Sequence, residues 1–302
     1  MTINSKIQLI CVAVLLVVAS SASCWGALVF SALHHGSWKV YFHMDITSPP
    51  KLVTEIITGD ENAPVLTRDK QRVAFEVQGT GIYICPINSL SVCEVIRPPH
   101  GSAVRPAWHA TTSELIFVNY VFSSGHEDSD ILTTRGGLVE TGPLLTQTGN
   151  QDYPDVSPDG RLLAYSSGLT VSFHRSAVQV VQQIWIMSLE TGRAHHLILS
   201  NAQDIHPDWS PSEQELAFAS DRTEQFEIWV VHADGSGLRQ VTSGPGAKTW
   251  PAWSPDGKSI MFTLTKEGRQ SLWLIDVDGL NLRPFEPFGP NADVELRDAD
   301  WR

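Results

Sequence analysis

Six residues of this chain share one position of an internal repeat, each three residues before a large apolar residue. Most of their side chains are polar, charged or aromatic and could bind a ligand. The set is Ala63, Arg105, Tyr153, His206, Trp250 and Asp298, and Arg297 stands next to its last member. Its side chains include a cation, aromatic rings, an imidazole and a carboxylate, which together can hold a peptide segment or a sugar acid. The alternative is that these side chains satisfy strand ends and line a water-filled channel.

Other signatures of catalysis or metal binding are weak in the sequence. Asp276-Val277-Asp278-Gly279 resembles the start of a calcium loop, but position twelve is Pro287, where a bidentate glutamate is needed. His195-His196 and His34-His35 have no partners at metal-ligand spacing. The chain contains no Gly-x-Ser-x-Gly, Cys-x-x-Cys or glycine-rich phosphate loop. The sequence therefore predicts no cofactor, no metal and no catalytic residues.

The elements that must position these residues are strands of an internal repeat. Large apolar residues, which we name first marks, are each followed nine positions later by another large apolar residue; they are Leu66, Trp108, Val156, Trp209 and Trp253. Trp301 is a sixth first mark, so the marks are 42 to 53 residues apart, as in four-stranded propeller blades. Turn segments such as Ser157-Pro158-Asp159-Gly160 lie between the paired positions and predict hairpins.

The two ends of the chain are predicted to share one blade. Phe30 and Tyr41 are 11 residues apart, as are Phe218 and Trp229, so the N-terminus supplies the last three strands of a blade. Residues 297–301 then supply its first strand. We predict an all-β, six-bladed β-propeller, closed by pairing the C-terminal strand with the N-terminal blade, which removes free sheet edges.

Two connections between the second and third strands are long. In blade three the connection runs through His126 and Asp128 and precedes a candidate third strand at Ile131-Leu132; in blade four it covers residues 168–181, including His174 and Arg175. We expect both to be loops that open on the same face as the channel mouth. Long loops on a rigid scaffold often carry function, so these four polar residues are further binding candidates.

Composition and the N-terminus indicate export. The net charge is −12 with no basic cluster, which argues against nucleic acid or an anionic membrane surface as partner. Residues 1–23 resemble a signal peptide, with cleavage after Ser23 and the propeller over residues 24–302. The uncharged run continues to Leu33, so an uncleaved membrane anchor stays open, as does lipidation of Cys24. The expected location is periplasmic or secreted.

Two cysteines are predicted to form a disulfide. Cys85 and Cys93 share the midpoint of the Tyr83–Val95 pair, so they should lie opposite each other on the third and fourth strands of blade two. A disulfide there suits an oxidising compartment. Two free thiols in the hairpin are the alternative.

Three segments of the later blades resemble the TolB-type propeller repeat. They are Pro207-Asp208-Trp209-Ser210-Pro211, Ile228-Trp229-Val230-Val231-His232-Ala233-Asp234-Gly235 and Pro251-Ala252-Trp253-Ser254-Pro255-Asp256-Gly257-Lys258. The resemblance covers residues 27–302 and implies a propeller without the N-terminal α/β domain of that family. TolB proteins are periplasmic and bind a peptidoglycan-associated lipoprotein over the propeller, so the resemblance also implies protein binding.

Two functions remain open on the sequence. The first is an exported, monomeric, non-enzymatic scaffold that binds a protein or peptide at the channel mouth, for cell-envelope maintenance or transport. The second is a polysaccharide-active lyase or hydrolase that uses His206 with Arg105 and Asp298, or a bound metal, in the central channel. A carboxylate or metal within hydrogen-bond reach of His206 would favour the enzyme.

Overall fold

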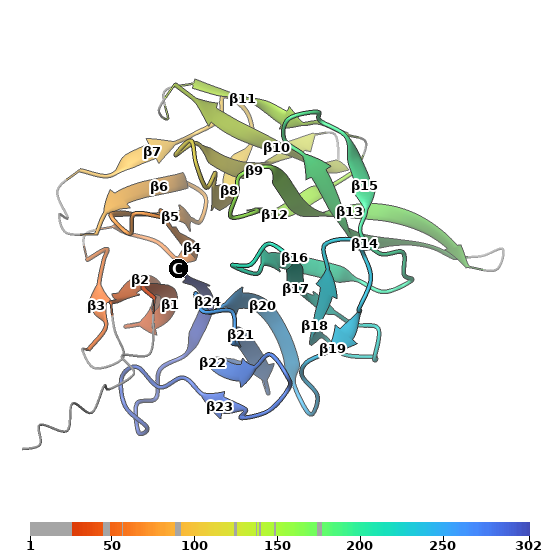
Figure 1. Ribbon diagram of the computed structural model, residues 1–302. Helices are drawn as coiled ribbons and strands as arrows, with labels where there is room; N and C mark the ends of the chain where they lie inside the picture. Colours follow the sequence, from red (N-terminus) through yellow and green to blue (C-terminus); the bar gives the residue numbers. More distant parts are fainter. Residues whose placement is uncertain are drawn as a thin grey trace, which may run out of the picture.

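The protein is a ring of six four-stranded antiparallel sheets around a central channel (Figure 1). The structure, a computed structural model, describes residues 26–302 apart from 45–48, 56, 88–91, 124–125, 137, 139, 148 and 174–176. Every regular element in the described part is a strand. The prediction of an all-β, six-bladed propeller is therefore confirmed.

The leader predicted over residues 1–23 lies outside the described residues. Over the described part of the chain, no helix is long and apolar enough to span a membrane.

The first three blades follow one another around the ring, each written here from its innermost strand outward. Blade one contains β24 (Leu296–Trp301), β1 (Leu28–His34), β2 (Ser37–His43) and β3 (Lys51–Leu52). Blade two contains β4 (Glu61–Leu66), β5 (Arg72–Val77), β6 (Gly81–Pro86) and β7 (Glu94–Ile96). Blade three contains β8 (Ser102–Trp108), β9 (Leu115–Ser123), β10 (His126–Arg135) and β11 (Glu140–Leu145).

The other three blades repeat this order. Blade four contains β12 (Gln151–Val156), β13 (Leu162–Phe173), β14 (Ala177–Ser188) and β15 (Ala194–His196). Blade five contains β16 (Asp204–Trp209), β17 (Glu215–Ser220), β18 (Glu227–His232) and β19 (Arg239–Gln240). Blade six contains β20 (Ala247–Trp253), β21 (Ser259–Lys266), β22 (Arg269–Asp276) and β23 (Arg283–Pro284).

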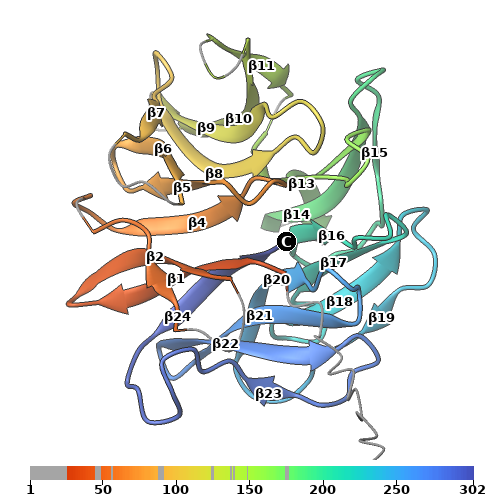
Figure 2. The same ribbon diagram turned by 60° about the vertical axis from the view of Figure 1, so that its left-hand side comes forward.

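The C-terminal strand closes the ring, as predicted. β24 pairs antiparallel with β1, with Leu28 opposite Trp301 and Ala32 opposite Leu296. The backbone N–H of Arg302 also donates to the carbonyl of Ala27, 2.8 Å away. Both views show β24 lying along β1 at the centre of the ring (Figures 1 and 2).

The repeated apolar positions pair across the middle strands of the blades. Phe30 lies opposite Tyr41, and Phe218 lies opposite Trp229, so the 11-residue spacing found in the sequence is a real strand register. In blade three, Phe117 lies opposite Leu132, which places the candidate third strand in β10. Large apolar residues on both faces of the middle strands bury against neighbouring blades, and this packing holds the ring together.

The two long connections are not loops, so that prediction was wrong. In blade three, residues 126–135 form β10 and pair with β9 from His126 opposite Ser123 onward. In blade four, β13 and β14 pair along twelve residues each, from Leu162 opposite Ser188 to Phe173 opposite Ala177. In blade four, uncharged and β-branched residues continue both strands where the sequence analysis expected an insertion. In blade three, the residues expected in a loop belong to β10 although they include Glu127, Asp128 and Asp130.

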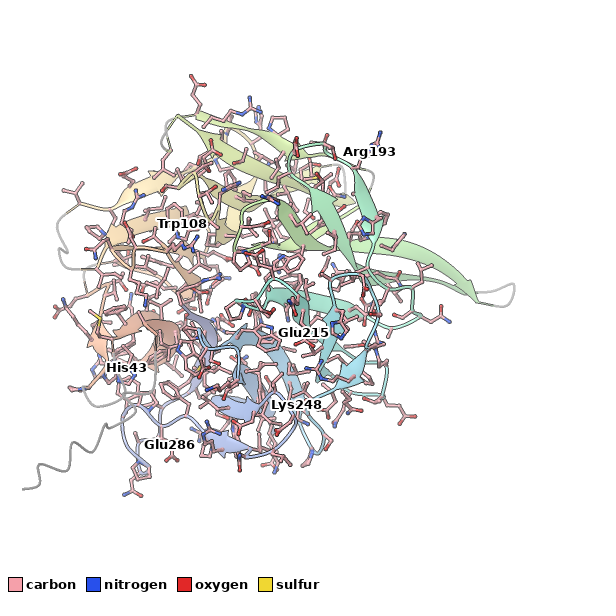
Figure 3. All side chains as sticks on the ribbon, viewed as in Figure 1. His43, Trp108, Arg193, Glu215, Lys248 and Glu286 are labelled. Atoms are coloured by element: carbon pink, nitrogen blue, oxygen red, sulfur yellow. A yellow bond between two sulfur atoms is a disulfide. The ribbon has the colours of Figure 1, made fainter. Side chains whose placement is uncertain are left out.

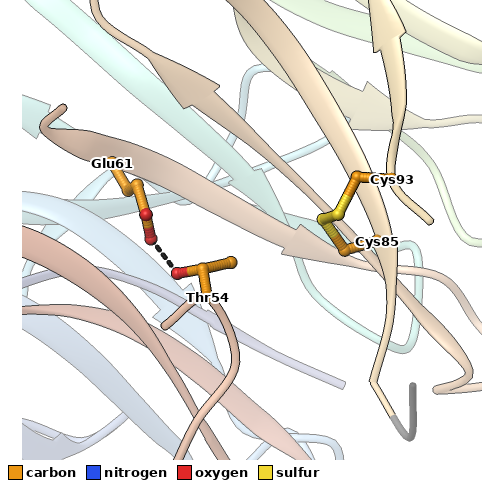
Figure 4. Close-up of a disulfide and its surroundings, with 4 residues drawn as sticks. All are labelled: Thr54, Glu61, Cys85 and Cys93. Carbon is orange, nitrogen blue, oxygen red and sulfur yellow. Dashed lines mark hydrogen bonds between the residues drawn. A yellow bond between two sulfur atoms is a disulfide. The ribbon is translucent and has the colours of Figure 1, made fainter. Parts of the chain in front are cut away.

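Cys85 and Cys93 form the predicted disulfide between β6 and the residue before β7 (Figure 4). Their Cα atoms are 4.4 Å apart, and the two cysteines are eight positions apart in the sequence. The Cys85 side chain is buried in the core between blades one and two.

Replacing both cysteines by alanine should lower the free energy of unfolding by about 2 kcal/mol, because a short cross-link removes loop entropy from the unfolded chain. Urea denaturation of both proteins, oxidised and reduced, measures this. Reduction should bring the wild-type protein close to the double variant and leave that variant unchanged; an effect of the reductant on the variant would contradict the assignment.

Two buried ion pairs connect neighbouring blades. Lys39 of β2 contacts Glu61 of β4 at 2.9 Å, and Lys248 of β20 contacts Glu227 of β18 at 2.8 Å. Figure 4 shows the Glu61 carboxylate accepting a hydrogen bond from the Thr54 hydroxyl. Figure 3 shows Lys248 inside the body of the molecule, whereas Arg193 lies at its periphery. Each pair bridges two blades, so it also fixes their relative positions.

Candidate binding site

Each innermost strand carries a bulge at the position singled out in the sequence. The strand register shifts there in all six blades. The residues at the shift have positive φ angles: Ala63 (46°), Arg105 (50°), Tyr153 (52°), His206 (56°), Trp250 (53°) and Asp298 (50°). Five of them precede a proline, which cannot donate to the strand ladder and keeps the preceding residue out of the right-handed helical region.

These bulges turn their residues into the central channel. All six line one cavity of about 80 Å³, together with the prolines that follow five of them. A non-glycine residue in this conformation costs roughly 1–3 kcal/mol, and such residues cluster at functional sites. All six residues around this cavity adopt the same strained backbone conformation. The strain therefore belongs to the site as a whole and not to one blade.

Replacing Ala63 with glycine tests the strain directly. Glycine adopts positive φ without steric cost, so the free energy of unfolding should rise by about 0.5–1 kcal/mol. Ala107 lies on the neighbouring innermost strand without a positive φ, and Ala107→Gly should lower the free energy of unfolding instead. Thermal or urea denaturation of the two variants checks the opposite signs.

Three aromatic rings and a guanidinium pack together at one end of the channel, which we call the mouth. The guanidinium of Arg105 lies 4.3 Å from the centre of the Tyr153 ring. The Tyr153 ring meets His206 edge to face at 4.2 Å, and His206 stacks on Trp250 at 4.0 Å. These are favourable aromatic and cation–π geometries. Tyr153 and Trp250 remain partly exposed, so the mouth presents aromatic surface to an incoming segment.

The charge of Arg105 is already satisfied inside the protein. Its guanidinium donates to Asp152 at 2.6 Å, to the Tyr120 hydroxyl at 2.7 Å and to the Tyr153 hydroxyl at 3.2 Å. Tyr120 in turn donates to Asp152 at 2.5 Å. Burial, followed by the charge of Asp152, raises the pKa of Tyr120, so this hydroxyl stays protonated. Arg105 therefore holds Tyr153 in place more than it offers a free cation to a ligand.

His206 is a neutral imidazole at the mouth. Burial, followed by the charge of Arg105, lowers the pKa of His206 well below its ordinary value. The backbone N–H of Trp250 lies 3.4 Å from Nδ1, so Nδ1 accepts and the ring proton is on Nε2. In the described residues no carboxylate bonds to this imidazole. The carboxylate partner that would have favoured an enzyme is therefore not found among these residues.

The last two predicted mouth residues differ in position. Asp298 lines the cavity, and burial raises the pKa of its carboxyl group. Arg297 does not line it: the guanidinium stacks 3.8 Å from the Trp38 ring and donates to Asn62 and Gln270. Arg297 thus contacts these three neighbours between blades, and its Nε also lies 3.4 Å from the carboxylate of Asp298, which lines the channel cavity.

The other predicted binding residues are not part of the described mouth cluster. His126 and Asp128 belong to β10, and Asp128 does not line the channel cavity. His174 and Arg175 lie outside the described residues. The structure therefore assembles one cluster, at the mouth, from part of the predicted set.

A second group of channel residues was missed by the sequence analysis. The carboxylates of Asp155, Asp208 and Asp300 each accept a 2.7 Å hydrogen bond from the backbone N–H of a first mark in a neighbouring blade, namely Trp209, Trp253 and Leu66. Arg302 lies 2.9 Å from Asp300 and 3.6 Å from Asp155. The signal was available, because each aspartate immediately precedes a first mark.

Three carboxylates share one guanidinium in this part of the channel. Burial, followed by the charge of Asp155, raises the pKa of Asp208 well above its ordinary value. Over the described residues, no group of three or more histidine, cysteine, aspartate or glutamate side chains is arranged to hold a metal ion. The aspartates connect neighbouring blades through their hydrogen bonds to backbone N–H groups.

The opposite end of the channel is wider than the mouth. A bowl of about 300 Å³ opens there among the turns between first and second strands. Its lining includes all six first marks, namely Leu66, Trp108, Val156, Trp209, Trp253 and Trp301. Four of them are tryptophans, of which Trp108 is partly exposed and the other three are buried.

Comparison with known proteins agrees with this architecture. The family model described as the TolB β-propeller domain matches residues 153–289. The solved structure of TolB from Acinetobacter baumannii aligns with a TM-score of 0.72 at 16% identity, over 91% of this chain and 66% of that chain. This chain is a TolB-like β-propeller.

Other similar proteins show how widely this propeller is used. A putative TolB from Agrobacterium tumefaciens aligns with a TM-score of 0.67 at 17% identity, over 91% of this chain and 98% of that chain. An oligogalacturonate lyase in complex with manganese aligns with a TM-score of 0.60 at 14% identity, over 86% of this chain and 73% of that chain. At sequence identities this low, the structural alignments show a shared fold only. The function of this TolB-like propeller has to be argued from its own residues.

One relative is closer in sequence. An uncharacterized protein of Agrobacterium fabrum is 30% identical over 143 residues, which is 47% of this chain. The match spans 42% of the length of that protein, so less than half of it has a counterpart in this TolB-like chain.

Proposed function

We propose that this chain is an exported, non-enzymatic scaffold that binds a segment of a protein partner at the channel mouth. The observation that carries the proposal is the packed cluster of Tyr153, His206 and Trp250 on strained bulges, with two of the rings partly exposed. Rigid aromatic side chains held by their neighbours are typical anchors for a peptide segment, because little side-chain entropy is lost on binding.

Export is supported by two features. The Cys85–Cys93 disulfide suits an oxidising compartment, and residues 1–23 resemble a signal peptide. A periplasmic or secreted location, with a role in envelope maintenance or transport, would match the resemblance to TolB. Retention of the N-terminal segment as a membrane anchor is the alternative location.

Site-specific photo-crosslinking in the native cells tests the binding proposal. A photoreactive amino acid at position 250 should capture one discrete partner, identified by mass spectrometry. The same amino acid at Glu190, an exposed position between β14 and β15, should capture none. Tyr153→Ala should reduce capture at position 250 by at least about tenfold, since an anchoring ring is worth 2 kcal/mol or more. Equal capture at both positions, or none at position 250, would contradict the mouth as the site.

An enzyme remains the second candidate, favoured by one arrangement. A neutral His206 in the field of Arg105, with Asp298 in the same cavity, could take a proton beside the carboxylate of a sugar acid. Incubation with oligogalacturonate and Mn²⁺, followed by ultraviolet absorbance of unsaturated products, separates the two functions. A scaffold gives no turnover above the blank, whereas turnover abolished by His206→Ala would replace the scaffold with a lyase.

A further inference from the structure

The hairpin of β13 and β14 extends past the rest of blade four, beyond the edge of the ring (Figure 1). β12 pairs with β13 only as far as Gln151 opposite Ser167, and β15 pairs with β14 no farther than Trp185 opposite His196. The two strands themselves stay paired out to Phe173 opposite Ala177. The outer part of the hairpin is therefore a two-stranded ribbon.

The last backbone contacts along its two edges mark where the free edges begin. The N–H of Gly168 donates to the carbonyl of Asn150 at 3.2 Å, and the N–H of Gln182 donates to the side chain of Gln203 at 2.8 Å. Beyond these residues, no strand of the described structure pairs with residues 169–173 or residues 177–181 on their outer sides. Each free edge is five residues long, a usual length for a strand in a sheet.

These free edges lack the usual protection against pairing with another chain. Proteins normally guard an exposed edge strand with charged residues, proline, a bulge or short length. β13 and β14 contain no charged residue and no proline, although 18% of the whole chain is charged. A two-stranded ribbon is also only marginally stable in water by itself. The composition and the length of this hairpin both favour the addition of another strand.

We propose that residues 177–181 of β14 pair antiparallel with the same residues of a second copy. The result is a dimer with one four-stranded sheet, in the order β13, β14, β14 of the other copy, β13 of the other copy. A two-fold axis sets each strand antiparallel to its own copy, so the middle residue, Gln179, faces itself. An uncharged strand suits this arrangement, since like charges directly opposite each other are destabilising.

The β14 edge is favoured over the β13 edge by its residues. Three of the five residues from 177 to 181 are β-branched, compared with two, Thr170 and Val171, in residues 169–173. β-branched residues are enriched in strands. This proposal replaces the monomer expected from the sequence. It does not depend on the function of the mouth, but a dimer would present two mouths in one particle and could engage two partner segments at once.

Sedimentation velocity of the purified protein over a wide concentration range tests the proposal. The wild-type protein should convert from monomer to dimer as its concentration rises. Gln179→Lys places two like charges at the two-fold axis and should weaken dimerisation by more than about tenfold. Ser172→Lys adds the same charge to the other edge of the same hairpin and should leave dimerisation unchanged.

A cross-linking variant provides an independent readout. Gln179→Cys should form an intermolecular disulfide under mild oxidation, and Ser172→Cys should not. A wild-type protein that stays monomeric at every concentration would overturn the proposal, as would an equal effect of both lysine variants. If the wild-type protein is monomeric but the hairpin becomes protected from hydrogen exchange when a partner is added, the strand donor is that partner and not a second copy.

Discussion

Glu227→Gln should lower the free energy of unfolding by about 3–5 kcal/mol, because it leaves the buried Lys248 ammonium without its counter-charge. The Glu227 carboxylate accepts from Lys248 at 2.8 Å, from the Thr242 hydroxyl at 2.6 Å and from the Gln225 amide at 2.7 Å. Both members of the ion pair are at least nine-tenths buried. The neutral amide is nearly the same size, so the loss of stability comes from the charge. Urea denaturation at neutral pH measures it.

Glu215→Gln is the matched control for this measurement. Glu215 contacts Arg239 at 2.8 Å in the same blade, but both side chains are partly exposed. Solvent screens such a pair, so its loss should cost less than about 1 kcal/mol. If the two variants lost the same stability, burial would not be the reason why the Glu227–Lys248 pair matters.

Asp208→Asn should raise the stability of the protein at neutral pH and flatten its dependence on pH. The pKa of Asp208 in the folded protein is raised well above 3.8 by burial and then by the charge of Asp155. A carboxyl group with a raised folded-state pKa stabilises the fold below 3.8, and this contribution is lost as the pH rises through the folded value.

The asparagine variant keeps the hydrogen bond that the carboxylate makes. The amide oxygen can still accept from the backbone N–H of Trp253, which lies 2.7 Å from the carboxylate in the native protein. The difference in unfolding free energy between variant and wild type should therefore grow from below pH 4 towards neutrality, in denaturant titrations at a series of pH values. Glu190→Gln removes an exposed carboxylate and should show no such growth. A difference between variant and wild type that stayed constant over this pH range would contradict the raised pKa of Asp208.

The ring architecture was predictable because strand register in a hairpin is a local property. Turn residues such as Pro158 and Gly160 set each hairpin, and the apolar positions on either side then have only one partner register that buries them. The same spacing argument placed Phe30 opposite Tyr41 and Cys85 next to Cys93. It also identified the six bulge positions, whose shared location in the repeat brings them to one cavity.

The candidate site was predictable only in part, because its chemistry depends on distances between blades. Arg105 was expected to face a ligand, yet its guanidinium donates a 2.6 Å hydrogen bond to the carboxylate of Asp152, which belongs to a different blade. Arg297 lies beside Asp298 as expected, with Nε 3.4 Å from the carboxylate, but its guanidinium stacks on Trp38 and does not line the cavity. The spacing of residues along the sequence does not predict such contacts between side chains of different blades.

By itself, then, the sequence determined the number of blades, the pairing of the two chain ends and the ring of positions around the channel. These follow from periodicity and from turn chemistry, which act over a few residues. Only the tertiary structure decided which of those side chains meet, that His206 is neutral and that a wide aromatic bowl opens at the far end. It also decided that the blade-four insertion is a ribbon with free edges. Desolvation and pairing between residues distant in sequence set these features, and both exist only after the chain has closed into a ring.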